Sequence, residues 1–78
     1  MNKKYNLFPK LIECRKLLGY TQPDMAAIAG VSPETYKHHE RGLFDFRLME
    51  MLAIQEKIND DLQTNLTLDE IFRMEKIV

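Results

Sequence analysis

One stretch of this chain, positions 21–42, limits its fold more than any other, and it reads TQPDMAAIAGVSPETYKHHERG. Thr21 is placed to cap a first short helix, and Gly30 can adopt the positive φ that ends one. Ser32 followed by Pro33 is a typical start for a second helix. Because only about three residues separate the two helices, they should cross steeply, as in a helix-turn-helix.

A family resemblance is carried by residues in and just before this stretch. They are Thr21-Gln22, Met25-Ala26, Gly30-Val31-Ser32, Thr35 and Glu40-Arg41-Gly42, with Arg15 four residues before Gly19. Over roughly residues 8 to 58 the chain resembles the Cro/cI-type (XRE-like) helix-turn-helix domains of phage and bacterial regulators. The resemblance implies an all-α fold of five helices, with the second and third forming the helix-turn-helix. It also implies a DNA-binding transcriptional regulator or repressor of phage or mobile-element origin.

The size and composition of the chain fit one small globular domain spanning residues 1–78. It has 78 residues, of which 45% are hydrophobic, enough for a core and against disorder. No apolar run approaches the ~20 residues of a membrane helix, and the N-terminus lacks the apolar segment of a secretory signal. We expect a cytoplasmic protein without membrane association, in which the lone Cys14 is a small core or boundary residue.

Charge is distributed unevenly along the chain. The net charge is −1, yet residues 1–47 hold eight Lys/Arg against five acids, and residues 48–78 hold three against seven. The helix-turn-helix half is thus +3 and the remainder −4, which suits one face toward phosphate and another toward solvent or a protein. An uneven scatter by chance would look the same.

A first helix is expected from Asn6 to Leu18, after a mobile tail of residues 1–5. Its apolar positions recur at helical spacing, and Arg15 lies among them. A charge facing the core needs a partner. The resemblance implies that this partner is Glu40, in an ion pair that ties the first helix to the third and has a structural role.

The third helix, expected over Pro33 to Arg41, should have two faces. Tyr36 and His39 should face the protein. The outward positions are the ones a DNA major groove would meet, and the expected base contacts are Pro33, Glu34, Thr35, Lys37 and His38. A solvated polar face would show the same pattern. Adjacent His38 and His39 point about 100° apart on a helix, so we expect no metal site there.

Expected phosphate contacts flank this helix. The second helix should cover Gln22 to Ala29, and in similar domains the residue matching Gln22 contacts a phosphate and braces the third helix. An exposed polar residue in a first turn is the alternative. The full set of expected phosphate contacts is Gln22, Ser32, Arg41 and Lys10.

The connection after the third helix is unusually apolar, with Leu43, Phe44 and Phe46. In related domains it is polar or basic. One or two of these side chains can enter the core, and an exposed Phe44 would indicate a protein partner. The alternative is that all three are buried under the fourth helix.

Two further helices should complete the domain. The fourth begins near Phe46, with an apolar stripe that closes the core, and ends before an acidic break at 59–65; the stripe is Leu48, Met51, Leu52, Gln55 and Ile58. A last helix within residues 66–78 starts at a capping box, Thr67 to Glu70. Its apolar side chains Leu68, Ile71, Phe72 and Ile77 could pack on the domain's own core or on a second copy.

The sequence thus predicts a regulator that binds double-stranded operator DNA as a homodimer and takes neither a cofactor nor a small-molecule substrate. The alternative is an anti-repressor that uses the same fold to bind a partner repressor protein through Leu43, Phe44, Phe46, Ile71 and Phe72. An enzyme is not expected, because the sequence holds no Ser/His/Asp set, metal constellation or phosphate loop.

Overall fold

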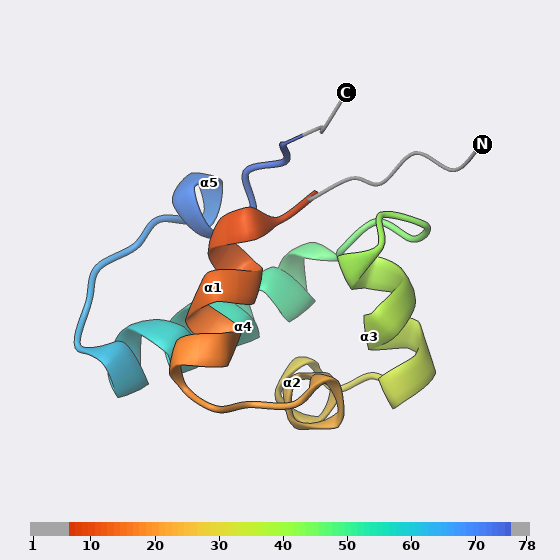
Figure 1. Ribbon diagram of the computed structural model, residues 1–78, viewed down its shortest axis with the longest axis horizontal. Helices are drawn as coiled ribbons and strands as arrows, with labels where there is room; N and C mark the ends of the chain where they lie inside the picture. The colour runs from red at the N-terminus through yellow and green to blue at the C-terminus, as the bar shows by residue number, and fades with distance from the viewer. Residues whose placement is uncertain (1–6, 76–78) are drawn as a thin grey trace.

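Five helices and no β-strand make up residues 7–75, the part of the chain that the computed structural model describes. They are α1 (Pro9–Leu17), α2 (Gln22–Ala29), α3 (Pro33–Glu40), α4 (Leu48–Leu62) and α5 (Leu68–Ile71). Figure 1 shows α1 lying across α4, with α5 on one side of the molecule and α3 on the other. The all-α, five-helix prediction is therefore confirmed. The first helix is shorter than predicted, because it begins at Pro9 instead of Asn6 and ends at Leu17, with Leu18 as its C-cap. The expected tail, residues 1–5, and Ile77 lie outside the described residues.

The core is built where the five helices meet. Its buried side chains come from every helix, and they are Phe8, Leu11, Cys14, Met25, Ala26, Tyr36, Ile54, Ile58 and Ile71. Phe8 and Phe72 each make edge-on contacts with Phe46, with ring centroids 5.3 and 5.0 Å apart. Edge-to-face pairs of this kind stabilise the fold beyond the burial of the rings themselves. Residues near both ends of the described chain therefore pack on the loop after α3.

Local signals set the α2–turn–α3 unit as the sequence predicted. The Thr21 hydroxyl accepts a hydrogen bond from the Asp24 backbone, and the Asp24 carboxylate accepts one from Thr21 N, which completes a capping box. Gly30 ends α2 with φ of +79°. The Ser32 hydroxyl accepts from Thr35 N at 3.1 Å and so caps α3. Each predicted cap is present.

The fourth helix differs from its prediction in start, end and phase. It begins at Leu48 instead of Phe46 and continues through the expected acidic break to Leu62. In the stripe predicted to close the core, Ile58 is buried as expected, but Leu48 and Leu52 are 58% and 39% exposed, and the buried Ile54 was not predicted. Glu50, Ile54 and Ile58 are spaced four residues apart and form the buried face of α4. Because Glu50 is charged, this face did not read as an apolar stripe in the sequence.

The helix continues past Asn59 because this side chain stabilises the turn that follows. Asn59 Oδ1 accepts from Leu66 N at 2.9 Å and from the Thr64 hydroxyl at 2.8 Å, and Nδ2 donates to the Leu66 carbonyl at 2.9 Å. The turn therefore falls after Gln63, which has the positive φ of 55° typical of a helix end.

The C-terminal element is shorter than predicted and packs on its own domain. The Thr67–Glu70 capping box is present, but α5 ends at Ile71. Ile71 is fully buried, so its predicted place in a protein interface is wrong. Phe72 is half-buried against Phe8 and Phe46. The chain then runs beside the start of α1, where Glu75 N donates to the Leu7 carbonyl at 3.2 Å.

Gly42 packs against Leu7 at the end of α3. A Cβ added at Gly42 would lie 1.9 Å from Leu7 Cδ1, and φ is +78°; Gly30 has nearly the same φ but open space around it. We expect Gly30→Ala to cost about 1–2 kcal/mol of unfolding free energy from backbone strain. Gly42→Ala should cost about 1 kcal/mol more, because Leu7 must move. Urea denaturation of both variants measures the difference, and equal losses would contradict the contact.

None of the helices within residues 7–75 combines the length and the apolar character needed to cross a membrane.

Candidate nucleic-acid interface

The third helix has one face in the core and one face in solvent. Tyr36, His39 and Glu40 are buried, as predicted for the first two. Pro33, Glu34 and Lys37 are exposed on the other face. Arg41 is exposed as well but forms the C-cap of α3 instead of its last residue. The exposed face of α3 is therefore a strip of polar side chains, and its position is set by the buried residues of the opposite face.

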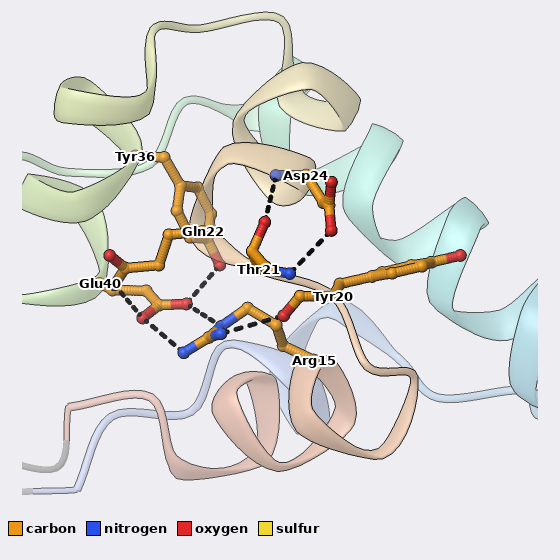
Figure 2. A network of polar contacts seen from close by, with 7 residues as sticks. All are labelled: Arg15, Tyr20, Thr21, Gln22, Asp24, Tyr36 and Glu40. Carbon is orange, nitrogen blue, oxygen red and sulfur yellow. Dashed lines mark hydrogen bonds and ion pairs between the residues drawn. The ribbon is translucent and has the colours of Figure 1, made fainter.

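Glu40 is the centre of the network that holds α3 in place, shown in Figure 2. Its Oε2 accepts from Arg15 Nε at 2.8 Å and from the Tyr36 hydroxyl at 2.7 Å. Its Oε1 accepts from Gln22 Nε2 at 2.9 Å. The Arg15 and Glu40 side chains are only 14% and 5% exposed, so the predicted ion pair is confirmed and is largely buried.

This network joins three helices through one carboxylate. Arg15 lies in α1, Gln22 starts α2, and Glu40 ends α3. Arg15 Nη1 also donates to the Tyr20 carbonyl at 3.1 Å, and this bond ties the connection between α1 and α2 to the same network. Because all of Glu40's close partners donate to it, the carboxylate is paired as a buried charge must be. The orientation of α3 relative to α1 and α2 is thereby set.

Tyr36 contributes a buried hydroxyl to this network. Burial, and next the neighbouring Glu40 charge, raise the pKa of Tyr36 above its usual range. The protonated phenol is thus favoured in the folded state. Its contribution to stability is present below the unfolded pKa of about 10 and is lost as pH rises above it, because the unfolded chain then releases a proton that the folded chain keeps.

Replacing Tyr36 with phenylalanine is expected to lower the unfolding free energy near neutral pH by about 1.5–3 kcal/mol, the range for a hydrogen bond to a charged group. The variant should also lose less stability between pH 9 and pH 11 than the wild type, because one tyrosine with a raised pKa is gone. Urea denaturation across this pH range measures both effects. An unchanged alkaline profile would contradict burial of the phenol.

The expected base contacts differ in how free their side chains are. Glu34 is 83% exposed, and its Oε2 lies 3.8 Å from Nε2 of His38, which is 27% exposed. The His38 ring packs edge-on against Phe44 with centroids 5.0 Å apart. The Thr35 hydroxyl accepts from the Ser32 hydroxyl at 2.9 Å, so these two polar groups are partly used by each other. Of the expected base contacts with a charged side chain, Glu34 and Lys37 are the most exposed to solvent.

The expected phosphate contacts are not all brought together. Gln22 directs its amide to Glu40, which places it as a brace for α3. Ser32 and Arg41 lie at the two ends of α3. Lys10 pairs with Glu13 at 3.4 Å, and it shares a hollow with Glu70 and Arg73 near α5. Figure 1 shows this end of α1 well away from the start of α3.

The apolar loop after α3 divides between core and solvent. Phe46 stacks on the His39 ring, with centroids 4.6 Å apart and an interplanar angle of 23°. Leu43 and Phe44 are 64% and 52% exposed. The interpretation in which one or two of these side chains enter the core and Phe44 is exposed is confirmed, since Phe46 is partly buried against the core. The alternative that all three are buried is wrong. Phe46 is therefore unsuited to the interface proposed for it.

Sequence reasoning missed the environment of His39. Its Nδ1 lies 3.0 Å from the Phe44 carbonyl, and its Nε2 lies 3.1 Å from Glu50 Oε1 without forming a hydrogen bond. Glu50 Oε1 accepts instead from Arg47 N at 2.9 Å, as at the start of a capped helix. Arginine is not a capping residue, so the spacing from Arg47 to Glu50 carried no recognisable signal.

The candidate interface is thus the strip of Glu34, Lys37 and His38 on α3, with Arg41 at its end and the exposed Leu43–Phe44 pair beside it. The Glu40 network holds the backbone of α3 in place, and the contact between the Phe44 and His38 rings holds the His38 side chain. No protein-family model, curated protein or solved structure matches this chain.

Proposed function

We propose that this protein is a sequence-specific DNA-binding transcriptional regulator of the Cro/cI type that reads operator DNA through α3. The observation that carries the proposal is the two-faced α3. Its inner face is bonded through Glu40 to α1 and α2, and its outer face carries Glu34 and Lys37 free of the core. A B-DNA major groove about 12 Å wide admits one helix.

Rigid placement of this helix is what base reading requires. Base contacts discriminate only when side chains start from a fixed backbone, while phosphate contacts hold the register. The Glu40 network supports the first requirement, and we propose that Ser32 and Arg41, at the two ends of α3, make the phosphate contacts. An eight-residue helix reads few base pairs, so we propose that two copies bind a palindromic operator, with half-sites about 34 Å apart.

Binding of the purified full chain to DNA from its own genetic neighbourhood tests the proposal. We expect a sequence-specific complex whose affinity falls steeply between low and moderate salt, because Lys and Arg displace counterions from phosphates. Sedimentation of the complex should give two protein chains per site. A complex that forms equally on any DNA, or none at micromolar protein, would contradict the proposal.

The exposed pair Leu43 and Phe44 favours a second candidate, an anti-repressor or modulator that binds a repressor protein. Aromatic side chains are enriched in protein–protein interfaces relative to the rest of a protein surface, and Phe44 is 52% exposed. The repressor encoded beside this chain, if present, is the partner to test by copurification. Phe44→Ser should abolish that complex, whereas Leu17→Ser, a change at an exposed apolar side chain at the end of α1, should leave it intact.

A further inference from the structure

The outer face of α3 offers a restricted set of base-reading groups. The helix reads PETYKHHE, with neither asparagine nor glutamine. Those two amides are the side chains that pair bidentately with adenine in the major groove. The exposed groups are instead the carboxylate of Glu34 and the ammonium of Lys37.

A carboxylate in the major groove selects a base by what it can accept. Glu34 can accept a hydrogen bond only from cytosine N4 or adenine N6, because the other major-groove edges present acceptors or a methyl group. Adenine N6 stands beside the N7 acceptor, which the ionised carboxylate would face unpaired. Cytosine N4 has no acceptor beside it on its own base and only the O6 of the paired guanine on its other side, whereas adenine N6 lies between N7 and thymine O4, so cytosine is the favoured partner of Glu34.

Lys37 favours guanine, the purine that pairs with cytosine. Its ammonium is donor-only and matches the O6 and N7 acceptors of guanine. Three residues along a helix rise about 4.5 Å, which is close to the 3.4 Å spacing of successive base pairs. Glu34 and Lys37 are three residues apart and lie within about 60° on one side of α3, so they can reach neighbouring pairs.

His38 is placed to orient the Glu34 carboxylate. Its Nε2 lies 3.8 Å from Glu34 Oε2, and its ring is held by the edge-on Phe44 ring at 5.0 Å. The Glu34 side chain is otherwise exposed and free to rotate. A half-buried ring beside it narrows the positions that the carboxylate adopts, which reduces the entropy lost on meeting a base.

We infer that α3 reads two neighbouring G·C pairs in each operator half-site, cytosine through Glu34 and guanine through Lys37, with His38 as a positioning residue for Glu34. The inference rests on the proposed function. It deepens that function by assigning the base class at two positions and one residue to each.

Selection from a randomised double-stranded DNA library with the purified full chain is the direct test. The enriched site should contain a cytosine and a guanine at fixed neighbouring pairs, each preferred over other bases by about 5- to 140-fold. Glu34→Gln should change the first preference from cytosine to adenine, since glutamine pairs with adenine, and should leave the guanine unchanged. Glu56→Gln, the same change at an exposed position of α4, should leave both preferences unchanged.

The role of His38 has its own readout. His38→Ala should weaken the cytosine preference at the Glu34 pair several-fold and leave the guanine preference of Lys37 unchanged. A purely structural role would lower affinity for every sequence alike, so equal loss at both positions would overturn the positioning role.

The remaining outcomes separate the two proposals. An enriched site with A·T pairs at both positions, or a Glu34→Gln variant with wild-type preferences, would overturn this inference and leave DNA binding standing. No enrichment of any sequence would overturn the proposed function, and this inference with it.

Discussion

Replacing Glu40 with alanine is expected to lower the free energy of unfolding by about 3–5 kcal/mol, the range for breaking a buried ion pair from one side. The change leaves the Arg15 guanidinium, 14% exposed, without its carboxylate. It also removes the acceptor of the Tyr36 hydroxyl and of the Gln22 amide. Because small domains are stable by only about 5–15 kcal/mol, the loss should be plain in urea denaturation at neutral pH.

A matched control for Glu40 lies on the same helix. Glu34→Ala also removes a carboxylate from α3, but its side chain is 83% exposed and within residues 7–75 its ion-pair partner is His38 at 3.8 Å, so we expect a change within about 0.5 kcal/mol. The double variant Arg15→Ala/Glu40→Ala should lose less than the sum of the single losses, because the two partners share one interaction. Additive losses, or a Glu40→Ala loss no larger than that of the control, would contradict a buried pair.

Replacing Lys37 with alanine is expected to weaken binding to the selected operator by about 5- to 140-fold, the value of one good base contact. Lys37 is exposed and outside the Glu40 network, so the fold should persist. Binding to unrelated DNA should change much less. Fluorescence anisotropy with operator and unrelated duplexes at one fixed salt concentration measures the ratio of the two affinities.

Arg41 and Lys57 serve as comparisons for Lys37. Arg41→Ala should weaken binding to all sequences alike and reduce the salt dependence by about one phosphate contact. Lys57→Ala removes the same charge from α4, where Lys57 pairs with Asp61 at 3.3 Å, and should leave DNA affinity nearly unchanged. If Lys37→Ala behaves like Lys57→Ala, α3 does not read DNA bases.

The predictions that succeeded rest on short-range signals. Thr21, Ser32 and Thr67 each cap a helix as predicted, because the cap and its backbone donor lie three residues apart in the chain. Gly30 ends α2 for a similar local reason, since its positive φ is accessible without a Cβ. Such signals depend on neighbours in sequence and hold whatever the rest of the chain does.

The position of Arg15 on an apolar stripe predicted a partner, and the family resemblance identified Glu40. What the sequence did not reveal is that Gln22 and Tyr36 donate to the same carboxylate. Tyr36 lies one turn before Glu40, but Gln22 belongs to another helix. Only the crossing of α2 and α3 brings its amide within 2.9 Å of Glu40 Oε1.

The failures concern which apolar side chains are buried. The apolar residues of α4 allowed more than one buried face, and packing against α2 and α5 selected the face that contains Ile54 together with the correctly predicted Ile58. Leu48 is exposed as a result. Ile71 was assigned to an interface because an isolated amphipathic segment does not show what it will pack on.

The sequence by itself thus determined where α2 and α3 lie, how α2, α3 and α5 begin, and which face of α3 is polar, because these depend on residues one or two turns apart. It did not determine the start of α1, which was predicted at Asn6 and lies at Pro9. The tertiary structure alone decided the partial burial of Phe46, the exposure of Phe44 and the position of His38 between Glu34 and Phe44. Burial depends on surfaces contributed by Phe8 and Phe72, far away in the chain. Their contact with the loop after α3 exists only once the helices have packed.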